Sequence, residues 1–191
     1  MKVYMIRHGE TDANKQMIIQ GRTNNPLNKT GIMQAKKTGQ YLKSLQIPFD
    51  YCMTSPLDRA IHTADIIKKE LNLNLETHIE KDIIERDFGA YDGRVIDDTY
   101  QEAVHGHSVP GLETDQMIEK RVADFFNKFF KNNHYENVLM ITHAHVLKAL
   151  LVQNLKGFSY DEYLVNCSIN IIEYKDKIKV IEYNIDPINQ E

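Results

Sequence analysis

Short apolar runs typical of buried strands alternate with amphipathic helix patterns along this chain, and that alternation most constrains its fold. Residues 3–6 and 138–142 have the pattern of buried strands, and residues 30–45 carry apolar side chains at helical spacing. Strands and helices that alternate in this way build a mostly parallel sheet with helices on both faces. The sequence therefore predicts an α/β fold with three layers, α/β/α, around a mostly parallel sheet.

The remaining elements follow the same logic. We expect strands at 49–54, 75–79, 168–174 and 178–183, and helices from Ser55 onward, at 115–130 and at 144–155. Thr30 and Ser55 are expected to cap their helices, because hydroxyl side chains accept hydrogen bonds from first-turn N–H groups. The last two strands flank a Lys175-Asp176-Lys177 turn, which predicts an antiparallel hairpin.

One stretch, residues 87–114, breaks the alternation. It is rich in glycine and has only a weak helical piece near 98–104. Segments of this length in a compact fold tend to carry function. Because we find no repeat, low-complexity segment or linker, we expect one domain over residues 1–191, with 87–114 as an irregular excursion that shapes the substrate entrance.

Composition restricts the classes of partner. The chain of 191 residues has 23 basic and 27 acidic residues, a net charge of −4, so we expect no nucleic-acid binding by charge alone. No apolar run reaches the length of a membrane span, and the first residues lack the pattern of a signal peptide. Cys52 and Cys167 lie far apart and are expected to be buried free thiols. These features favour a cytoplasmic protein without a membrane partner.

Three predicted strands end in polar residues: Arg7-His8, Thr54-Ser55 and Thr142-His143. In open α/β sheets, ligands bind beyond the carboxyl ends of the strands, so these residues are expected to converge there. A mildly acidic protein that binds an anion must gather its positive charge in one place. The arginines and histidines at this edge are the residues that can do so.

The individual residue types fit an anion site. Arg7 offers a planar fork of donors that matches phosphate oxygens, and Gly9 lets the backbone approach a ligand. His143 precedes a predicted helix, whose first N–H groups favour anions. Arg59 lies near the start of another helix, where a cation is unfavourable unless an anionic ligand is bound. Glu85, taken alone, is more typical of a surface carboxylate.

Five blocks of residues then occur in a fixed order. They are Arg7-His8-Gly9-Glu10-Thr11 with Asn14; Gln20-Gly21 and Leu27-Asn28-Lys29-Thr30-Gly31 with Gln34-Ala35; Ser55-Pro56-Leu57-Asp58-Arg59-Ala60 with Thr63-Ala64; Glu85 with Phe88-Gly89 and Asp92-Gly93; and Thr142-His143. This series resembles the histidine phosphatase superfamily, the phosphoglycerate mutase-like proteins, over nearly the whole chain. The resemblance implies a phosphoglycerate mutase-like fold and an enzyme of the phosphatase branch.

The resemblance also implies roles. His8 is expected to be the nucleophile that becomes phosphohistidine, and Glu85 the proton donor to the leaving group. The residues expected to bind the phosphoryl group are Arg7, Asn14, Gly21, Arg59, His143 and Ala144. We therefore expect a phosphomonoesterase that hydrolyses a small phosphate ester.

The expected chemistry accounts for these residue types. Phosphoryl transfer is catalysed mainly by positioning and by stabilising charge on three oxygens, which two arginines and a histidine supply without a metal or other cofactor. A neutral imidazole is a good nucleophile near neutrality, and a carboxyl group can protonate the departing alkoxide.

Alternatives remain open. The family's last block commonly reads Thr-His-Gly-Gly, whereas Ala144 and His145 follow His143 here; we expect His145 to line the pocket. A zinc site is a further alternative, because histidine clusters bind zinc and the chain has His105, His107, His143 and His145. A site built on a nucleophile and arginines gains nothing from a competing cation, so we expect no metal.

Two other functions compete with the phosphatase. One is a phosphoglycerate mutase, although the true mutases that the chain resembles are typically longer. The other is an idle member that binds a phospholigand. The physiological ester and the oligomeric state are not readable from the sequence, and the candidate selectors in the excursion are Tyr91, Tyr100, His105 and His107.

Overall fold

The computed structural model describes residues 1–106 and 108–189. Its elements in chain order are β1 (Lys2–Arg7), α1 (Asp12–Lys15), α2 (Lys29–Ser44), β2 (Tyr51–Thr54), α3 (Asp58–Leu71), β3 (Thr77–Ile79), the 3-10 turns η1 (Lys81–Ile83) and η2 (Gly89–Tyr91), α4 (Tyr100–His105), α5 (Asp115–Asn132), β4 (Asn137–Thr142), α6 (Ala144–Asn154), β5 (Ile169–Tyr174) and β6 (Ile178–Ile185). None of the helices in the described ranges is long and apolar enough to cross a membrane.

The six strands form one sheet in the order β3-β2-β4-β1-β5-β6. The pairings among β3, β2, β4 and β1 are parallel, and those of β5 with β1 and with β6 are antiparallel. The prediction of a mostly parallel sheet with a final hairpin is confirmed.

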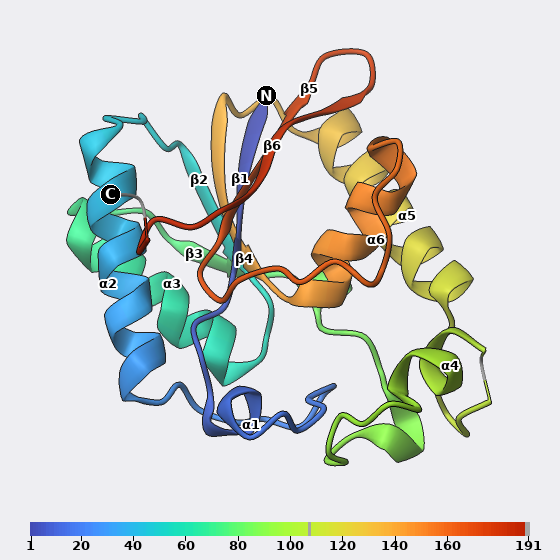
Figure 1. Cartoon of the computed structure of the whole chain (residues 1–191). Coiled ribbons are helices and arrows are strands. Elements are labelled where there is room, and N and C mark those ends of the chain that lie inside the picture. The colour runs from blue at the N-terminus through green and yellow to red at the C-terminus, as the bar shows by residue number, and fades with distance from the viewer. Residues whose placement is uncertain (107, 190–191) are drawn as a thin grey trace.

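Helices cover both faces of this sheet, with α2 and α3 on one side and α5 and α6 on the other (Figure 1). Side chains alternate between the two faces because successive strand residues point in opposite directions. In β1, Val3 and Met5 pack in the cluster with α5 and α6, whereas Tyr4 and Ile6 pack in the cluster with α2 and α3. The predicted three-layer α/β/α arrangement is therefore confirmed.

Two helix starts differ from expectation. α2 is capped by Asn28, whose side chain accepts from the N–H of Gly31, and not by Thr30. α3 begins at Asp58 behind Leu57, which makes no side-chain cap, so Ser55 and Pro56 lie before the helix. The Ser55 hydroxyl accepts from the N–H of Leu57 at 3.4 Å, ahead of the helix, and its Oγ lies 2.6 Å from Nε2 of His143.

The described residues of the excursion, 87–106 and 108–114, pack against Ile19 and form a small apolar core with it. Its buried side chains are Ile19, Phe88, Val104, Val109 and Leu112. Arg86, fully buried, binds this core to α5 through an ion pair of 2.7 Å with Asp115. Figure 1 shows α1 and α4 beyond the same end of the sheet, the end at which β1 and β4 finish.

Candidate active site

His8 follows β1 directly and is held by backbone contacts. Its N–H donates to the carbonyl of Thr142 at 3.0 Å, which extends the pairing of β1 with β4 by one residue. Its carbonyl accepts from the side-chain amide of Asn166 at 3.0 Å. The imidazole is 3 % exposed, at the carboxyl edge of the sheet where the sequence places a ligand site.

The hydrogen bonds of the imidazole fix which nitrogen carries the proton. Nδ1 lies 2.7 Å from the carbonyl oxygen of Gly9, which can only accept, so Nδ1 must donate. Nε2 is then left with its lone pair, and the Nε of Arg59 donates to it at 3.3 Å. Burial lowers the pKa of His8 well below its ordinary value, and the charges of Arg59 and Arg7 add to the effect. His8 is therefore a neutral imidazole with Nε2 unprotonated.

Gly9 also has a packing role that the sequence did not indicate. A Cβ on Gly9 would lie 2.6 Å from the carbonyl oxygen of Gly31, and a Cβ on Gly31 would lie 2.1 Å from that of Glu10. The two glycines thus let the first turn of α2 touch the loop after β1, backbone against backbone. This close approach to another part of the chain by itself requires glycine at position 9.

Arg59 is fully buried although it occupies the first turn of α3. Its Nη1 and Nη2 donate to the carbonyls of Thr23 and Gly21, each at 2.8 Å. Gly21 therefore supports Arg59 through its carbonyl, and its N–H donates to Asp92 at 3.0 Å. Burial lowers the pKa of Arg59 to about 10, so the guanidinium stays charged at neutral pH.

Arg7, the last residue of β1, brings a second guanidinium to the site. Its Nη1 donates to the carbonyl of Leu164, and its guanidinium lies 5.6 Å from the ring centre of Tyr163. Its Nε is buried and has no hydrogen-bond partner in the described ranges. A buried donor without a partner costs free energy, which an anionic ligand would recover.

His143 lies beside His8, with ring centres 5.1 Å apart. Burial lowers its pKa well below the ordinary value, and the charge of Arg59 makes the next largest contribution in the same direction. Its Nε2 contacts the Ser55 hydroxyl at 2.6 Å, whereas its Nδ1 is buried without a partner among the described residues. His143 is thus the second neutral imidazole at this edge.

Glu85 is buried, 4 % exposed, and not a surface carboxylate. Its Oε1 accepts from the N–H groups of Arg86 at 2.8 Å and His145 at 3.2 Å, and no hydrogen bond to Oε2 is found in residues 1–106 and 108–189. Burial raises the pKa of Glu85, against the opposing effects of these N–H groups and the two arginines. The geometry leaves Oε2 as the atom to carry a proton.

A cavity of about 90 Å³ lies among these groups and is lined by Arg7, His8, Asn14, Glu85, Ala144 and His145, with others. Asn14 belongs to α1, where its Oδ1 accepts from the N–H of Thr11. His145 lines the cavity, as expected, with its Nδ1 4.0 Å from Glu85 Oε1 and its Nε2 3.5 Å from the hydroxyl of Tyr100. Arg59 and His143 lie beside His8 but are not among the lining residues of this cavity, and Gly21 lies behind Arg59.

The candidate selectors separate. Tyr100 lines the cavity, but neither Tyr91 nor His105 does. His105 instead contacts Asp115 at 2.8 Å, and its ring packs against Tyr160. His107 lies outside the described residues. No group of three His, Cys, Asp or Glu side chains within the described ranges could hold a metal ion.

Sequence reasoning missed the residues that hold the reactive ones. Thr63 and Asp92 stand in the recognised blocks but had no assigned role; Thr63 accepts from the N–H of Gly9 at 3.1 Å. Ser55 was expected as a cap and at this edge of the sheet, but its contact with His143 was not predicted. Asn166 carries no signal in the sequence, because its contact with His8 depends on the return of the chain before β5.

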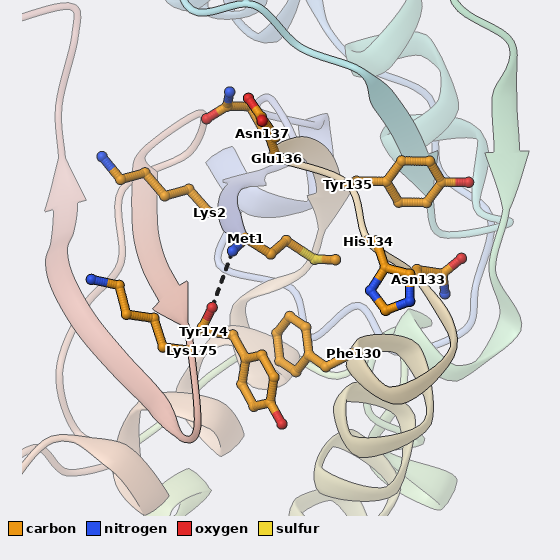
Figure 2. A pocket seen from close by; sticks show the side chains of 10 residues that line it. All are labelled: Met1, Lys2, Phe130, Asn133, His134, Tyr135, Glu136, Asn137, Tyr174 and Lys175. Atoms are coloured by element: carbon orange, nitrogen blue, oxygen red, sulfur yellow. Dashed lines mark hydrogen bonds between the residues drawn. The ribbon is translucent and has the colours of Figure 1, made fainter.

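A larger cavity, about 510 Å³, lies at the opposite end of the sheet (Figure 2). The first residues of β1 and the ends of α5 and β5 line it, and Phe130 and Tyr174 stack there with ring centres 4.1 Å apart. The α-amino group of Met1 donates to the carbonyl of Tyr174 at 3.0 Å. No predicted site residue lines this cavity.

Known proteins resemble the chain over nearly its whole length. The family model of the histidine phosphatase superfamily (branch 1) matches residues 3–186. The uncharacterized phosphatase PhoE of Bacillus subtilis (strain 168) is 34% identical over 191 residues, 96% of this chain and 94% of that protein.

Two solved structures have the same fold. The alpha-ribazole phosphatase from Shigella flexneri superposes with a TM-score of 0.81 at 28% identity and covers 100% of both chains. A phosphoglycerate mutase from Bacillus anthracis (strain Sterne) gives a TM-score of 0.85 at 22% identity, over 97% of this chain and 93% of that one.

Proposed function

The chain belongs to the histidine phosphatase superfamily (branch 1) and is a phosphomonoesterase, and from this premise we propose that it hydrolyses a small phosphate ester through a phosphohistidine on His8. The observation that carries the proposal is the state of that side chain. Its Nδ1 donates to the carbonyl of Gly9, so the lone pair of Nε2 lies beside the guanidinium of Arg59. A neutral nucleophile next to a fixed cation suits attack on a dianionic phosphoryl group.

The phosphoryl oxygens are bound by donors that the free protein leaves available. Arg7 Nε and His143 Nδ1 are both buried and without partners in the described part of the chain. Arg59 Nε, which donates to His8 in the free protein, turns to a phosphoryl oxygen when the Nε2 lone pair engages phosphorus. Asn14 and the N–H of Ala144 complete the set from the cavity wall.

Ser55 prepares His143 for this task. A serine hydroxyl can donate to His143 Nε2, which leaves the proton on Nδ1. Nδ1–H then donates to a phosphoryl oxygen, and the imidazole needs no charge to do so. The lowered pKa of His143 agrees with a neutral donor.

Glu85 supplies the proton for the leaving group. Attack by Nε2 forms the P–N bond while the P–O bond to the alcohol breaks, and Oε2–H of Glu85 protonates the departing oxygen. The Glu85 carboxylate then removes a proton from water, whose oxygen attacks phosphorus and breaks the P–N bond. Phosphate leaves, and both His8 and Glu85 return to their starting states.

Replacement of the nucleophile tests the proposal. His8→Ala should abolish hydrolysis of p-nitrophenyl phosphate and the acid-labile labelling of the protein by a radioactive phosphate ester. His134→Ala, an exposed histidine at the opposite end of the sheet, is the matched control and should keep full activity. Full activity in His8→Ala would refute the mechanism, and a wild-type protein inert towards a broad ester panel would favour the idle phospholigand binder.

Two further measurements separate the alternatives. Release of inorganic phosphate from 3-phosphoglycerate supports the phosphatase, whereas interconversion of 2- and 3-phosphoglycerate without release would favour a mutase. Because guanidinium and imidazole groups supply the positive charge, activity should survive exhaustive treatment with EDTA. Loss of activity that zinc or magnesium restores would contradict the metal-independent reaction.

A further inference from the structure

A second cavity, about 250 Å³, adjoins the one beside His8. The two share Arg7, Asn14, Tyr100 and His145 among their lining residues. An ester whose phosphoryl group lies at His8 has room for its alcohol portion in this adjoining cavity. The phosphoryl-transfer chemistry places no restriction on the alcohol portion, so the residues that line the cavity must determine which alcohols fit.

Exposed apolar side chains gather at the mouth of this cavity. Met17, Ile96 and Tyr163 are 56%, 36% and 70% exposed, and they come from three separate segments of the chain. Single exposed apolar residues are ordinary, but several on the rim of one cavity are typical of a ligand groove. Ile18 and Leu164 continue the apolar surface inward.

Besides Arg7, which the phosphoryl group would occupy, one lysine and two carboxylates line this cavity. Lys148 donates from Nζ to the carbonyl of Tyr160 at 2.6 Å, and burial lowers its pKa to about 8. Asp161 and Glu162 also line the cavity, and Glu162 accepts from the hydroxyl of Tyr183 at 3.4 Å. Two carboxylates at the wall disfavour a ligand that carries an anionic group besides its phosphate.

We propose, on the premise of the function above, that the substrate is a phosphate monoester whose alcohol portion is an apolar chain or aromatic ring without a second anionic group. That portion packs between Met17, Ile18, Ile96, Tyr100, Tyr163 and Leu164. Arg7 lines both cavities, and its guanidinium lies 5.6 Å from the ring centre of Tyr163. When the phosphoryl oxygens bind Arg7, an apolar alcohol portion that enters this cavity contacts the ring of Tyr163.

The test uses ethyl, butyl and hexyl phosphate, whose alcohols are similarly poor leaving groups and differ in apolar area. Each methylene that the cavity buries should raise kcat/KM by up to about fourfold, and hexyl phosphate should exceed ethyl phosphate by more than about tenfold. O-Phosphoserine and 3-phosphoglycerate, which carry a carboxylate, should be turned over less efficiently than butyl phosphate. Binding of the same esters to His8→Ala, measured by calorimetry, should follow the same order.

Matched variants locate the effect. Met17 has a left-handed backbone, φ 55°, that asparagine adopts readily, so Met17→Asn removes apolar surface without strain. The hexyl-to-ethyl ratio should fall about fivefold, the contribution of roughly one to two methylenes. Met117→Asn, at an equally exposed methionine on α5 that does not line the cavity, should leave the ratio unchanged.

The outcomes separate the two proposals. A flat alkyl series, or a preference for the carboxylate-bearing esters, overturns the apolar pocket while p-nitrophenyl phosphate is still hydrolysed and the proposed function stands. An equal change of the ratio in Met17→Asn and Met117→Asn overturns the assignment to this cavity. Absence of hydrolysis of every ester overturns both.

Discussion

His8 and Glu85 must hold protonation states that these side chains rarely hold together in water. With ordinary pKa values of 6.5 and 4.5, the carboxyl group loses its proton before the imidazole does. Here burial lowers the pKa of His8, with help from Arg59 and Arg7, and raises that of Glu85. The two shifts move toward each other, which raises the share of molecules with a neutral imidazole and a protonated carboxyl group.

Glu85→Gln should therefore lose activity according to the leaving group. We expect a fall in kcat of about 10²- to 10⁴-fold for butyl phosphate, since general acid catalysis contributes an effect of this size. The fall should be much smaller for p-nitrophenyl phosphate, whose phenolate needs no proton to leave. In the wild type, kcat/KM should decline at high pH as Glu85 ionises, and this decline should be absent in the variant.

Glu136→Gln is the control for removal of a carboxylate, because Glu136 lies at the opposite end of the sheet and should not affect activity. Equal losses in Glu85→Gln for the alkyl and nitrophenyl esters would contradict the role of Glu85 as a proton donor.

At the scale of elements, the excursion lines the cavity through Phe88 and Tyr100, and together with α5 it also positions residues of the proposed site from behind. Asp92 accepts from the N–H groups of Gly21 and Thr23, whose carbonyls hold Arg59. On the other side, Arg121 of α5 binds the loop that precedes Glu85. Its Nη1 donates to the carbonyls of Asp82 and Ile84, at 2.6 and 3.0 Å.

Arg121→Met should loosen that loop. The same guanidinium pairs with Glu113 through Nε at 2.7 Å and Nη2 at 2.9 Å, and Glu113 is buried. Without Arg121, the buried carboxylate keeps only the N–H of Asp87 at 3.2 Å and the guanidinium of Arg22 at 4.0 Å. We therefore expect a decrease of about 2–3 kcal/mol in the free energy of unfolding. A variant that still folds should show a larger change in kcat than in KM, because Glu85 is displaced while the phosphate-binding residues are not.

Lys120→Met is the matched control on the same helix. Lys120 pairs with Asp124 at the surface, where both side chains are well exposed, so its removal should change stability by less than about 1 kcal/mol. If denaturant unfolding gives the same loss for both variants, the loop is not held by Arg121.

The sequence predicted the elements better than their connections. The strands and helices followed from apolar periodicity, and the rule for the carboxyl ends of strands brought His8 and His143 to one edge. The burial of Arg59 was not predictable, since it depends on two carbonyls in an irregular loop. The cap at Asn28 was missed because Thr30 offered an equally good local signal. Local patterns report on side chains within a few residues, whereas these contacts join distant segments.

Across the whole molecule, buried neutral histidines couple stability to pH. Burial is the largest cause of the lowered pKa values of His8, His143 and His145. As the pH falls below 6.5, the unfolded chain binds protons that the folded protein does not, so the free energy of unfolding decreases. Glu85 has the opposite effect: its raised pKa adds stability below 4.5, and this is lost as the pH rises through the folded value.

The three histidines outweigh Glu85, so the free energy of unfolding should decrease as the pH falls. Thermal unfolding between pH 7.5 and pH 5 should show a falling Tm, each histidine contributing up to about 1.4 kcal/mol per pH unit. His145→Asn should reduce this slope, whereas His134→Asn, at an exposed histidine, should preserve it. A Tm independent of pH in this range would mean that these imidazoles are protonated in the folded protein.

The strand order has a consequence for synthesis of the chain. β1 is made first, yet Val3 pairs with Val138 on one side and Ile172 on the other. While the middle of the protein is still being translated, both hydrogen-bonding edges of this apolar strand are unpaired. Such long-range pairing slows folding and leaves a strand edge open to other chains. His8, the proposed nucleophile at the end of that strand, can thus reach its place beside Thr142 only after most of the polypeptide has emerged.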